Sequence, residues 1–127
     1  MRTYVAVGFG GALGAAIRAF IIAQSPDSPW VIASINVIGC AVLAIILTRV
    51  VRRFTQESWH EVGRPFLASG VMGGFTTTSA FAINIVDLLN TSAVEAIAYL
   101  LVSVVGGYFA FDFIARSAKS PNELAAP

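Results

Sequence analysis

Glycine and hydroxyl-bearing residues are concentrated in one short segment of an otherwise apolar stretch, residues 73–81. The segment reads Gly-Gly-Phe-Thr-Thr-Thr-Ser-Ala-Phe, and helix packing alone does not require so many polar positions. Adjacent glycines make a departure from helical geometry inexpensive, and hydroxyls can satisfy the backbone groups that such a departure frees. In hydrocarbon, non-helical backbone is tolerated only where it is buried or lines a cavity. We therefore predict a helix break at Gly73 and Gly74 that forms a site.

Two kinds of ion fit the chemistry of these residues. The hydroxyls, the Asn36 amide and the Tyr99 hydroxyl can donate hydrogen bonds to an anion, and aromatic rings present a positive edge. Carbonyls freed at the break offer an oxygen-lined site for a small cation. For Asn36, an interhelical hydrogen bond and a place in an ion path explain its position equally well. We favour an anion-attracting vestibule for Arg18, because no acidic residue near it is available to pair.

The composition identifies the class of protein that must hold these residues. The chain has 127 residues, of which 57% are hydrophobic and 12% charged. Its mean hydropathy is +0.78, too apolar for a water-soluble domain of this size. A bilayer core needs roughly 20 apolar residues per helix. The sequence therefore predicts an all-α membrane protein that forms a single domain over residues 1–127, with a flexible tail at 115–127. Its four transmembrane helices are expected at residues 4–23, 30–48, 66–89 and 93–114.

The distribution of basic residues predicts the orientation of the chain in the membrane. Arg18 lies within the first span, and the other seven of the eight Lys and Arg residues fall at the two termini or in the central link, residues 49–65. The links at residues 24–29 and 90–92 contain neither Lys nor Arg. By the positive-inside rule, both termini and the central link are expected in the cytoplasm.

Local motifs indicate where two spans begin and how the first one packs. Pro65 is expected at the start of the third span, where its missing N–H is harmless. Ser92 and Glu95 have capping-box spacing at the start of the fourth span. Gly10 and Gly14, four residues apart, form a small-residue face that favours close approach of another helix. A glycine phosphate loop is the weaker alternative, because no strand precedes them.

The positions of the acidic residues disfavour several functional classes. A proton-driven exporter needs a titratable group deep in the membrane, whereas the middle of each predicted span lacks Asp, Glu and His. A small multidrug exporter therefore remains only an alternative. No nucleophile and base pair or metal-ligand cluster indicates an enzyme, and nucleic acid is not expected as a partner. Passive conduction fits these residues better than coupled transport.

Three motifs resemble the Fluc fluoride channel family, also called the CrcB or camphor-resistance family. Residues 10–18, Gly-Gly-Ala-Leu-Gly-Ala-Ala-Ile-Arg, are similar to its GGxxGAxxR motif. Residues 36–39, Asn-Val-Ile-Gly, are similar to NxxG, and residues 70–77, Gly-Val-Met-Gly-Gly-Phe-Thr-Thr, are similar to GxxGGxTT. The third motif is highly specific, and the likeness covers the four spans.

The resemblance implies a function and a set of site residues. It implies a channel that lets cytoplasmic fluoride leave passively through a prokaryotic inner (plasma) membrane, built as an antiparallel, dual-topology dimer with two pores. It also implies a structural sodium ion, with Gly73 and Thr76 as ligands, and a vestibule at Arg18. The pore positions carried over are Asn36, Thr77, Thr78, Ser79, Phe81 and Tyr99.

Three departures from the family pattern lie along one polar track. Thr78 stands in place of the first of two pore phenylalanines, Ala80 in place of a hydroxyl, and Asn84 where many members carry glutamate. A subunit that pairs antiparallel with itself needs a weak charge bias, whereas the bias here is strong. The sequence therefore favours one half of a heterodimer with an oppositely oriented homologue. A non-conducting partner that only completes the other subunit's pore remains an alternative.

Overall fold

The computed structural model describes residues 1–54 and 56–118. Within that part of the chain, four helical stretches are long and apolar enough to cross a membrane: Arg2–Ala23, Pro29–Val50, Trp59–Thr91 and Ala93–Ser117. The prediction of an all-helical protein with four candidate spans is therefore confirmed. The fourth stretch extends through residues 115–117, which the sequence had placed in the tail, because Arg116 and Ser117 are helical. The predicted tail from Lys119 onward lies outside the described residues.

Most of the stretches combine regular α-helix with wider π-helical turns. The first is α1 (Arg2–Ala23), and the second comprises α2 (Pro29–Ile45) and η1 (Ile46–Val50), after which the short helix α3 (Val51–Arg53) follows. The third comprises η2 (Trp59–Gly63), η3 (Pro65–Val71), α4 (Met72–Phe75) and α5 (Thr78–Thr91). The fourth comprises α6 (Ala93–Leu101), η4 (Val102–Gly106) and α7 (Gly107–Ser117).

The third stretch begins earlier than the sequence predicts. Pro65 lies inside the helical stretch, as the first residue of η3, and η2 precedes it. A proline removes one backbone donor and crowds the preceding turn. Wider π-helical turns are one way in which a helix accommodates this kind of local disruption. The helical stretch therefore extends before Pro65, while Pro65 itself is the first residue of η3.

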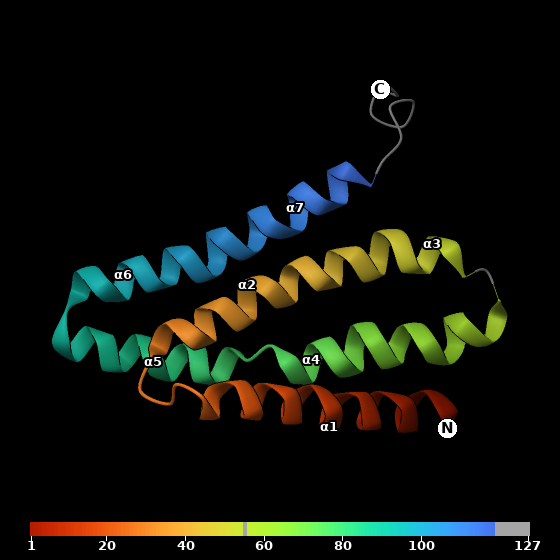
Figure 1. Ribbon diagram of the computed structural model, residues 1–127, viewed down its shortest axis with the longest axis horizontal. Coiled ribbons are helices and arrows are strands. Elements are labelled where there is room, and N and C mark those ends of the chain that lie inside the picture. Colours follow the sequence, from red (N-terminus) through yellow and green to blue (C-terminus); the bar gives the residue numbers. More distant parts are fainter. Residues whose placement is uncertain (55, 119–127) are drawn as a thin grey trace.

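The stretches alternate in direction, so related chain ends gather at two ends of the molecule (Figure 1). The N-terminus, the link between α3 and η2, and the end of α7 lie together, and we call this the basic end because it carries Arg2, Arg49, Arg53, Arg64 and Arg116. The α1–α2 and α5–α6 links lie at the opposite end. Because the stretches alternate in direction, these Arg residues of the links and helix ends lie at one end of the long axis of the fold.

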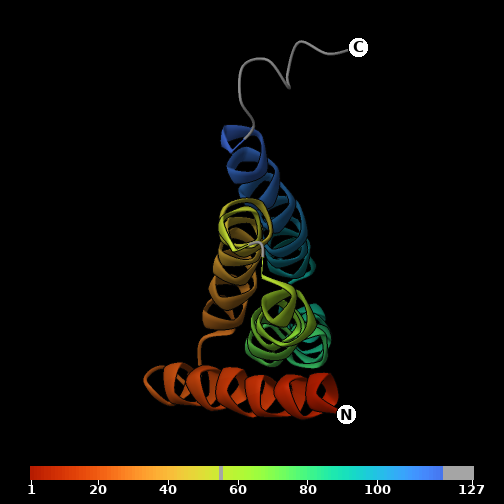
Figure 2. The same cartoon turned by 90° about the vertical axis from the view of Figure 1, so that its right-hand side faces the viewer.

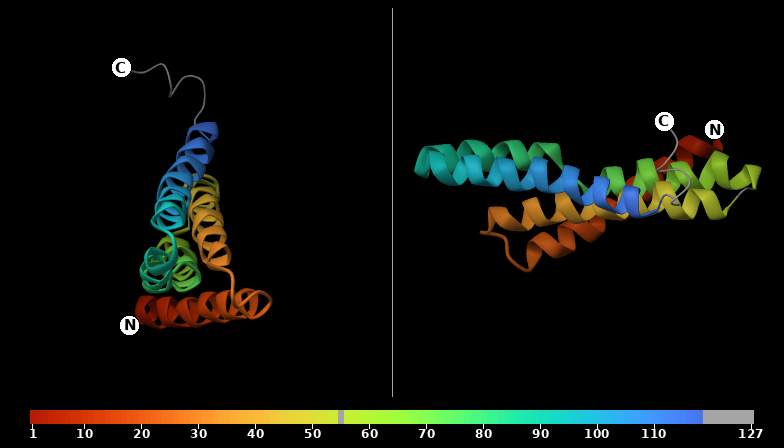
Figure 3. Two further views of the ribbon diagram at one scale, coloured as in Figure 1. Left: turned by 90° about the vertical axis from the view of Figure 1, so that its left-hand side faces the viewer. Right: turned by 90° about the horizontal axis from the view of Figure 1, so that it is seen from above.

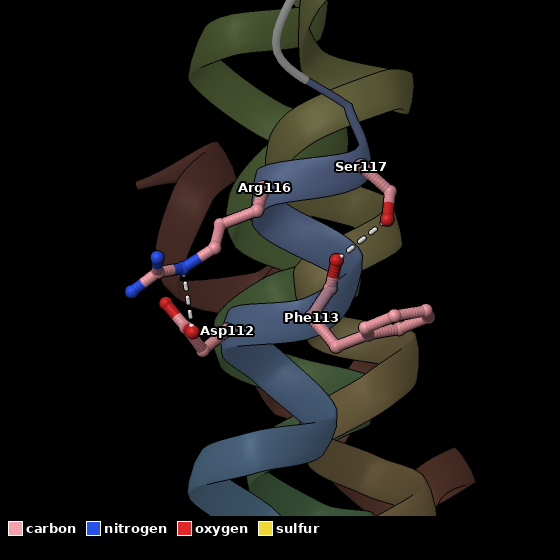
Figure 4. A network of polar contacts seen from close by, with 4 residues as sticks. All are labelled: Asp112, Phe113, Arg116 and Ser117. Atoms are coloured by element: carbon pink, nitrogen blue, oxygen red, sulfur yellow. Dashed lines mark hydrogen bonds and ion pairs between the residues drawn. The ribbon is translucent and has the colours of Figure 1, made fainter. Parts of the chain in front are cut away.

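At the end of α7, an ion pair joins two side chains one helical turn apart (Figure 4). The Nε atom of Arg116 lies 2.7 Å from Oδ2 of Asp112. The hydroxyl of Ser117 donates to the Phe113 carbonyl at 2.7 Å. Because the arginine side chain is 69% exposed, the pair contributes little stability, and we assign these residues to the helix end rather than to a site.

Helix α1 packs closely against η3 and α4. Seen end-on, α1 lies along one edge of the molecule and α7 along the other, with the second and third stretches between them (Figures 2 and 3). A Cβ atom added to Gly10 would lie 3.0 Å from Gly70 Cα, and one added to Gly14 would lie 2.7 Å from Phe75 N. The prediction that Gly10 and Gly14 allow close helix packing is confirmed.

The interior of the chain is small, as expected for a membrane protein. Ile32 and Ile35 of α2 pack in one buried cluster with Met72 and Phe75 of α4, together with Ile46. Many large apolar side chains point outward along α1, α5, α6 and α7. Such surfaces are stable against lipid or another protein and unstable against water. The Ser92 hydroxyl accepts from the Glu95 N–H at 3.3 Å, which confirms the predicted cap of α6.

Candidate functional site: the interrupted third helix

Helical geometry in the third stretch is interrupted at two threonines. Helix α4 ends at Phe75, Thr76 and Thr77 have extended backbones, and α5 begins at Thr78 (Figure 1). The sequence had placed the break at Gly73 and Gly74, which lie inside α4. Among the described residues no glycine has a positive φ, so backbone freedom is not their role. A Cβ atom added to Gly74 would instead overlap the backbone of Gly11.

Asn36 of α2 binds the non-helical backbone through both ends of its amide. Its Oδ1 accepts from the Thr77 N–H at 3.0 Å, and its Nδ2 donates to the Thr77 carbonyl at 3.3 Å. The side chain thus supplies both hydrogen bonds that an adjacent strand would offer. Because the Thr77 N–H donates to Asn36, it does not close the helical bond to the Gly73 carbonyl. The interhelical role that the sequence left open for Asn36 is therefore present.

Arg18 of α1 also contacts the interruption. Its Nη1 atom donates to the Thr76 carbonyl at 3.1 Å, and the side chain is half-buried. The sequence had placed Arg18 in a vestibule because no acidic partner was near, but a backbone carbonyl serves as its partner instead. A guanidinium has several donors, and the bond to Thr76 uses one of them. Arg18 and Asn36 therefore bind the two ends of the same peptide group, the Thr76 carbonyl and the Thr77 N–H, and Asn36 also binds the next carbonyl.

The hydroxyls around the interruption differ in exposure. The Thr77 side chain is buried, accepts from the Ala80 N–H at 3.3 Å and lies 3.2 Å from the Ser79 hydroxyl. Thr78 and Ser79 are exposed. Thr76 donates its hydroxyl to the Met72 carbonyl at 2.9 Å. Thr77 therefore caps α5, whereas Thr78 and Ser79 have surface left to contact a ligand.

A second group of predicted residues lies on α5 and α6. The rings of Phe81 and Tyr99 stack with centroids 5.5 Å apart, and Trp30 meets Tyr99 edge-on at 5.9 Å. Tyr99 is 0% exposed. Its hydroxyl oxygen accepts from Asn84 Nδ2 at 3.1 Å. The structure thus brings Phe81 and Tyr99 together, in a group separate from the residues that hold the interruption.

Three cavities follow one another along the third stretch. At the basic end, a cavity of about 410 Å³ is lined by His60, Arg64 and Ser69. It shares Leu43 and Ala68 with a cavity of about 280 Å³ at the interruption, which is lined by Asn36, Gly73, Thr76, Thr77 and Thr78 among others. At the opposite end, a cavity of about 460 Å³ is lined by Asn84, Asp27 and Asp87. The lining therefore changes from basic to acidic along the chain.

The carbonyls at the interruption can be compared with what a sodium ion requires. Helix C-terminal carbonyls at a break are typical ligands for such an ion. The Gly73 carbonyl is released, since the Thr77 N–H donates elsewhere, and Gly73 borders the cavity. The Thr76 carbonyl already accepts from Arg18 but keeps a second lone pair. The carbonyls of Gly73 and Thr76 are therefore two oxygens of this chain that could contact such an ion.

Sequence reasoning did not single out two further residues, Trp30 of α2 and Ser103 of η4. Trp30 packs on Tyr99 from the start of α2, and apolarity alone gives no sign of that contact. Ser103 is 6% exposed, and its hydroxyl has no hydrogen-bond partner in the described part of the chain. Its position four residues after Tyr99, on the same helical face, was the available signal. A buried hydroxyl without a partner is suited to a ligand or water.

The fold and the site together define a multi-pass membrane protein with a polar interruption in its third span. Residues 5–114 match the family described as CrcB-like protein, Camphor Resistance (CrcB). The chain belongs to this family.

Relatives with assigned names match most of the chain. It is 34% identical over 126 residues to "Fluoride-specific ion channel FluC 2" of Thermobifida fusca, covering 95% of this chain and 91% of that one. It is 36% identical over 108 residues to "Fluoride-specific ion channel FluC 2" of Nocardia farcinica, covering 80% and 74%. It is also 36% identical over 109 residues to "Fluoride-specific ion channel FluC" of Paracoccus denitrificans, covering 82% and 84%.

Proposed function

We propose that the chain is a subunit of a fluoride channel through which cytoplasmic fluoride leaves the cell passively, which reduces fluoride toxicity. The observation that carries this proposal is the interrupted third helix, whose exposed Thr78 lines a cavity between a basic and an acidic cavity. The names of the relatives supply the ion, because all three are called fluoride-specific. The membrane is the inner (plasma) membrane of a prokaryote.

The residues at the interruption suit a small, strongly hydrated anion. Thr78 and Ser79 offer hydroxyl donors to replace water, and Phe81 offers the positive edge of its ring. Arg64 at the basic end would raise the local anion concentration. No charged group of the third span between Arg64 and Asp87 would trap the ion. Fluoride could therefore lose water stepwise along the lining.

The sodium site and the dimer belong to the same proposal. One chain offers the Gly73 and Thr76 carbonyls, and an antiparallel partner would offer the matching pair to complete a structural, non-transported sodium site. A partner subunit of opposite orientation would also supply the phenylalanine and hydroxyl that Thr78 and Ala80 replace. Two relatives are named FluC 2, consistent with a second such chain in the same organism.

Fluoride efflux from liposomes tests the proposed function. The chain is reconstituted alone and together with its closest homologue from the same genome, and efflux is followed with a fluoride electrode. We expect rapid efflux from the pair and at least 100-fold less from the single chain, because Thr78 and Ala80 leave its own pore lining incomplete. Chloride efflux from the same liposomes is the selectivity control. Absence of fluoride efflux from both preparations would contradict the proposal.

Efflux from the pair also distinguishes a conducting subunit from a structural partner. A Ser79→Ala variant of this chain removes one exposed hydroxyl from its pore lining. If this chain lines a conducting pore, the variant should lower efflux several-fold. Unchanged efflux would favour the non-conducting role, in which only the homologue's lining carries the ion.

A labelling experiment tests the fixed orientation. In a Cys40→Ser background, a cysteine replacing Asn90 is expected to react only with an impermeant thiol reagent added outside the cell, since the link at 90–92 carries no basic residue. A cysteine replacing Ser58, in the central link, should react only after the membrane is opened. Equal labelling of both positions from outside would mean that the chain inserts in both orientations.

A further inference from the structure

Charged side chains of opposite sign line the two end cavities of the third stretch, and the chain between them is uncharged. The cavity of about 460 Å³, which we call the acidic cavity, is lined by Asp27 of the α1–α2 link and Asp87 of α5, and no Lys or Arg of the described chain lines it. The third stretch has no charged residue between Arg64 and Asp87, and the second has none between Pro29 and Thr48. The fixed charge that an anion meets therefore changes from positive to negative along the chain.

Other charged residues of the described chain do not cancel this difference. Glu57 and Glu61 belong to the central link, but neither lines the cavity that Arg64 and His60 line at the basic end. Arg18, the one basic residue within a predicted span, donates to the Thr76 carbonyl and does not line the acidic cavity. The two carboxylates are therefore not balanced by a basic side chain among the described residues of that lining.

The predicted orientation places the acidic cavity at the outer face of the membrane. The positive-inside rule puts the basic end in the cytoplasm, and the α1–α2 and α5–α6 links lie at the opposite end (Figure 1). An oppositely oriented partner that inserts by the same rule would also carry its basic residues on the cytoplasmic side, so it would not reverse the difference. An anion that leaves the cell therefore reaches the carboxylates last, and one that enters meets them first.

The position of a barrier along a channel determines how the membrane voltage acts on it. An inside-negative voltage drives an anion outward, and most of that voltage has acted on the ion before it reaches the acidic cavity, which lowers the barrier there. When the opposite voltage drives an anion inward, the same barrier lies at the entrance, where the voltage has acted little. Equal and opposite voltages then give unequal currents, although the two one-way fluxes stay equal at equilibrium.

We propose that the path through this chain rectifies, carrying more anion outward than inward at equal and opposite voltages, and that Asp27 and Asp87 cause this preference. The inference rests on the proposed function, because it requires that the chain conducts an anion. An anion about 8 Å from both carboxylates would be depleted roughly fivefold in water before screening by salt. With screening, we expect the outward current to exceed the inward current about threefold.

Membrane vesicles that keep the orientation of the cell test this proposal, with whichever preparation conducts fluoride. Right-side-out vesicles hold equal fluoride on both sides, and a potassium gradient with valinomycin sets the voltage. A fluoride electrode records net efflux at an inside-negative voltage and net uptake at the opposite voltage of the same size. We expect efflux to be about three times as fast as uptake. Equal rates would overturn the inference, as would faster uptake.

Neutral variants show whether the two carboxylates are the cause. The double variant Asp27→Asn with Asp87→Asn is expected to speed uptake about threefold, so that it nearly equals efflux. Loss of folded protein cannot produce such a gain. Asp112→Asn removes a carboxylate from the end of α7, where it pairs with Arg116, and should leave the ratio of efflux to uptake unchanged. A double variant that keeps the wild-type ratio would refute the assignment.

Ionic strength provides an independent check and separates this inference from the proposed function. Added sodium gluconate that raises the ionic strength from about 0.1 M to about 1 M shortens the Debye length from about 10 Å to about 3 Å. The wild-type ratio should then fall toward one, and a ratio that does not respond to salt would contradict the inference. If the vesicles conduct no fluoride at either voltage, the proposed function fails instead.

Discussion

The Asn36→Asp variant is expected to conduct fluoride about 100-fold more slowly than the wild type. Asn36 accepts from the Thr77 N–H and donates to the Thr77 carbonyl. A carboxylate keeps the first bond but places a negative oxygen against the carbonyl oxygen. It also repels a fluoride ion about 6 Å away by roughly 3 kcal/mol at an effective dielectric constant of about 20, which corresponds to about 100-fold.

Two further variants separate the charge from the lost hydrogen bond. Asn36→Leu removes both hydrogen bonds without adding charge, and we expect it to conduct faster than Asn36→Asp. Cys40→Ser changes a residue one turn along α2 that lines the same cavity, and it should conduct normally. Efflux is measured by electrode at equal protein content. Wild-type efflux from Asn36→Asp would remove Asn36 from the ion path.

The spans could be predicted from the sequence because a bilayer imposes a simple constraint. A helix must carry an unbroken apolar stretch of fixed length to cross it, and hydropathy reports that stretch directly. The packing role of Gly10 and Gly14 was equally accessible, since spacing by four places small residues on one face. The helical segment before Pro65 was not predicted, because the sequence does not reveal that π-helical turns will flank this proline.

The site was only partly predictable, for a different physical reason. The type and spacing of the residues indicated that the third span would be interrupted, but they placed the interruption at Gly73 and Gly74 rather than at Thr76 and Thr77. They did not indicate that Arg18 and Asn36, from two other helices, would supply the hydrogen bonds that hold it. Such contacts depend on how the helices rotate and cross, and no local pattern encodes that arrangement. The Asn84 contact with Tyr99 was missed as a contact for the same reason, although its departure from the family pattern was visible.

Substitutions at the adjacent residues Gly73 and Gly74 are expected to have opposite effects on the stability of the single chain. A methyl group added at Gly74 would overlap the backbone of Gly11, 2.9 Å from its Cα atom. Neither backbone can move without separating α1 from α4, so we expect Gly74→Ala to lower the free energy of unfolding by about 3 kcal/mol. A methyl group added at Gly73 meets no atom of the described chain within 4 Å. Gly73→Ala should therefore leave the fold of the single chain intact.

The proposed dimer and sodium site predict a specific effect of a larger side chain at Gly73. If its carbonyl and exposed surface face a partner and a sodium ion, Gly73→Val should weaken dimer formation and remove sodium-dependent stabilisation, while helix content stays unchanged. Dimer fraction by single-molecule photobleaching and melting temperature with and without sodium measure these effects. A stable dimer that still responds to sodium would place the cation elsewhere. Because the two glycines are neighbours in α4, their difference separates contacts within the chain from contacts that only a second chain or an ion can make.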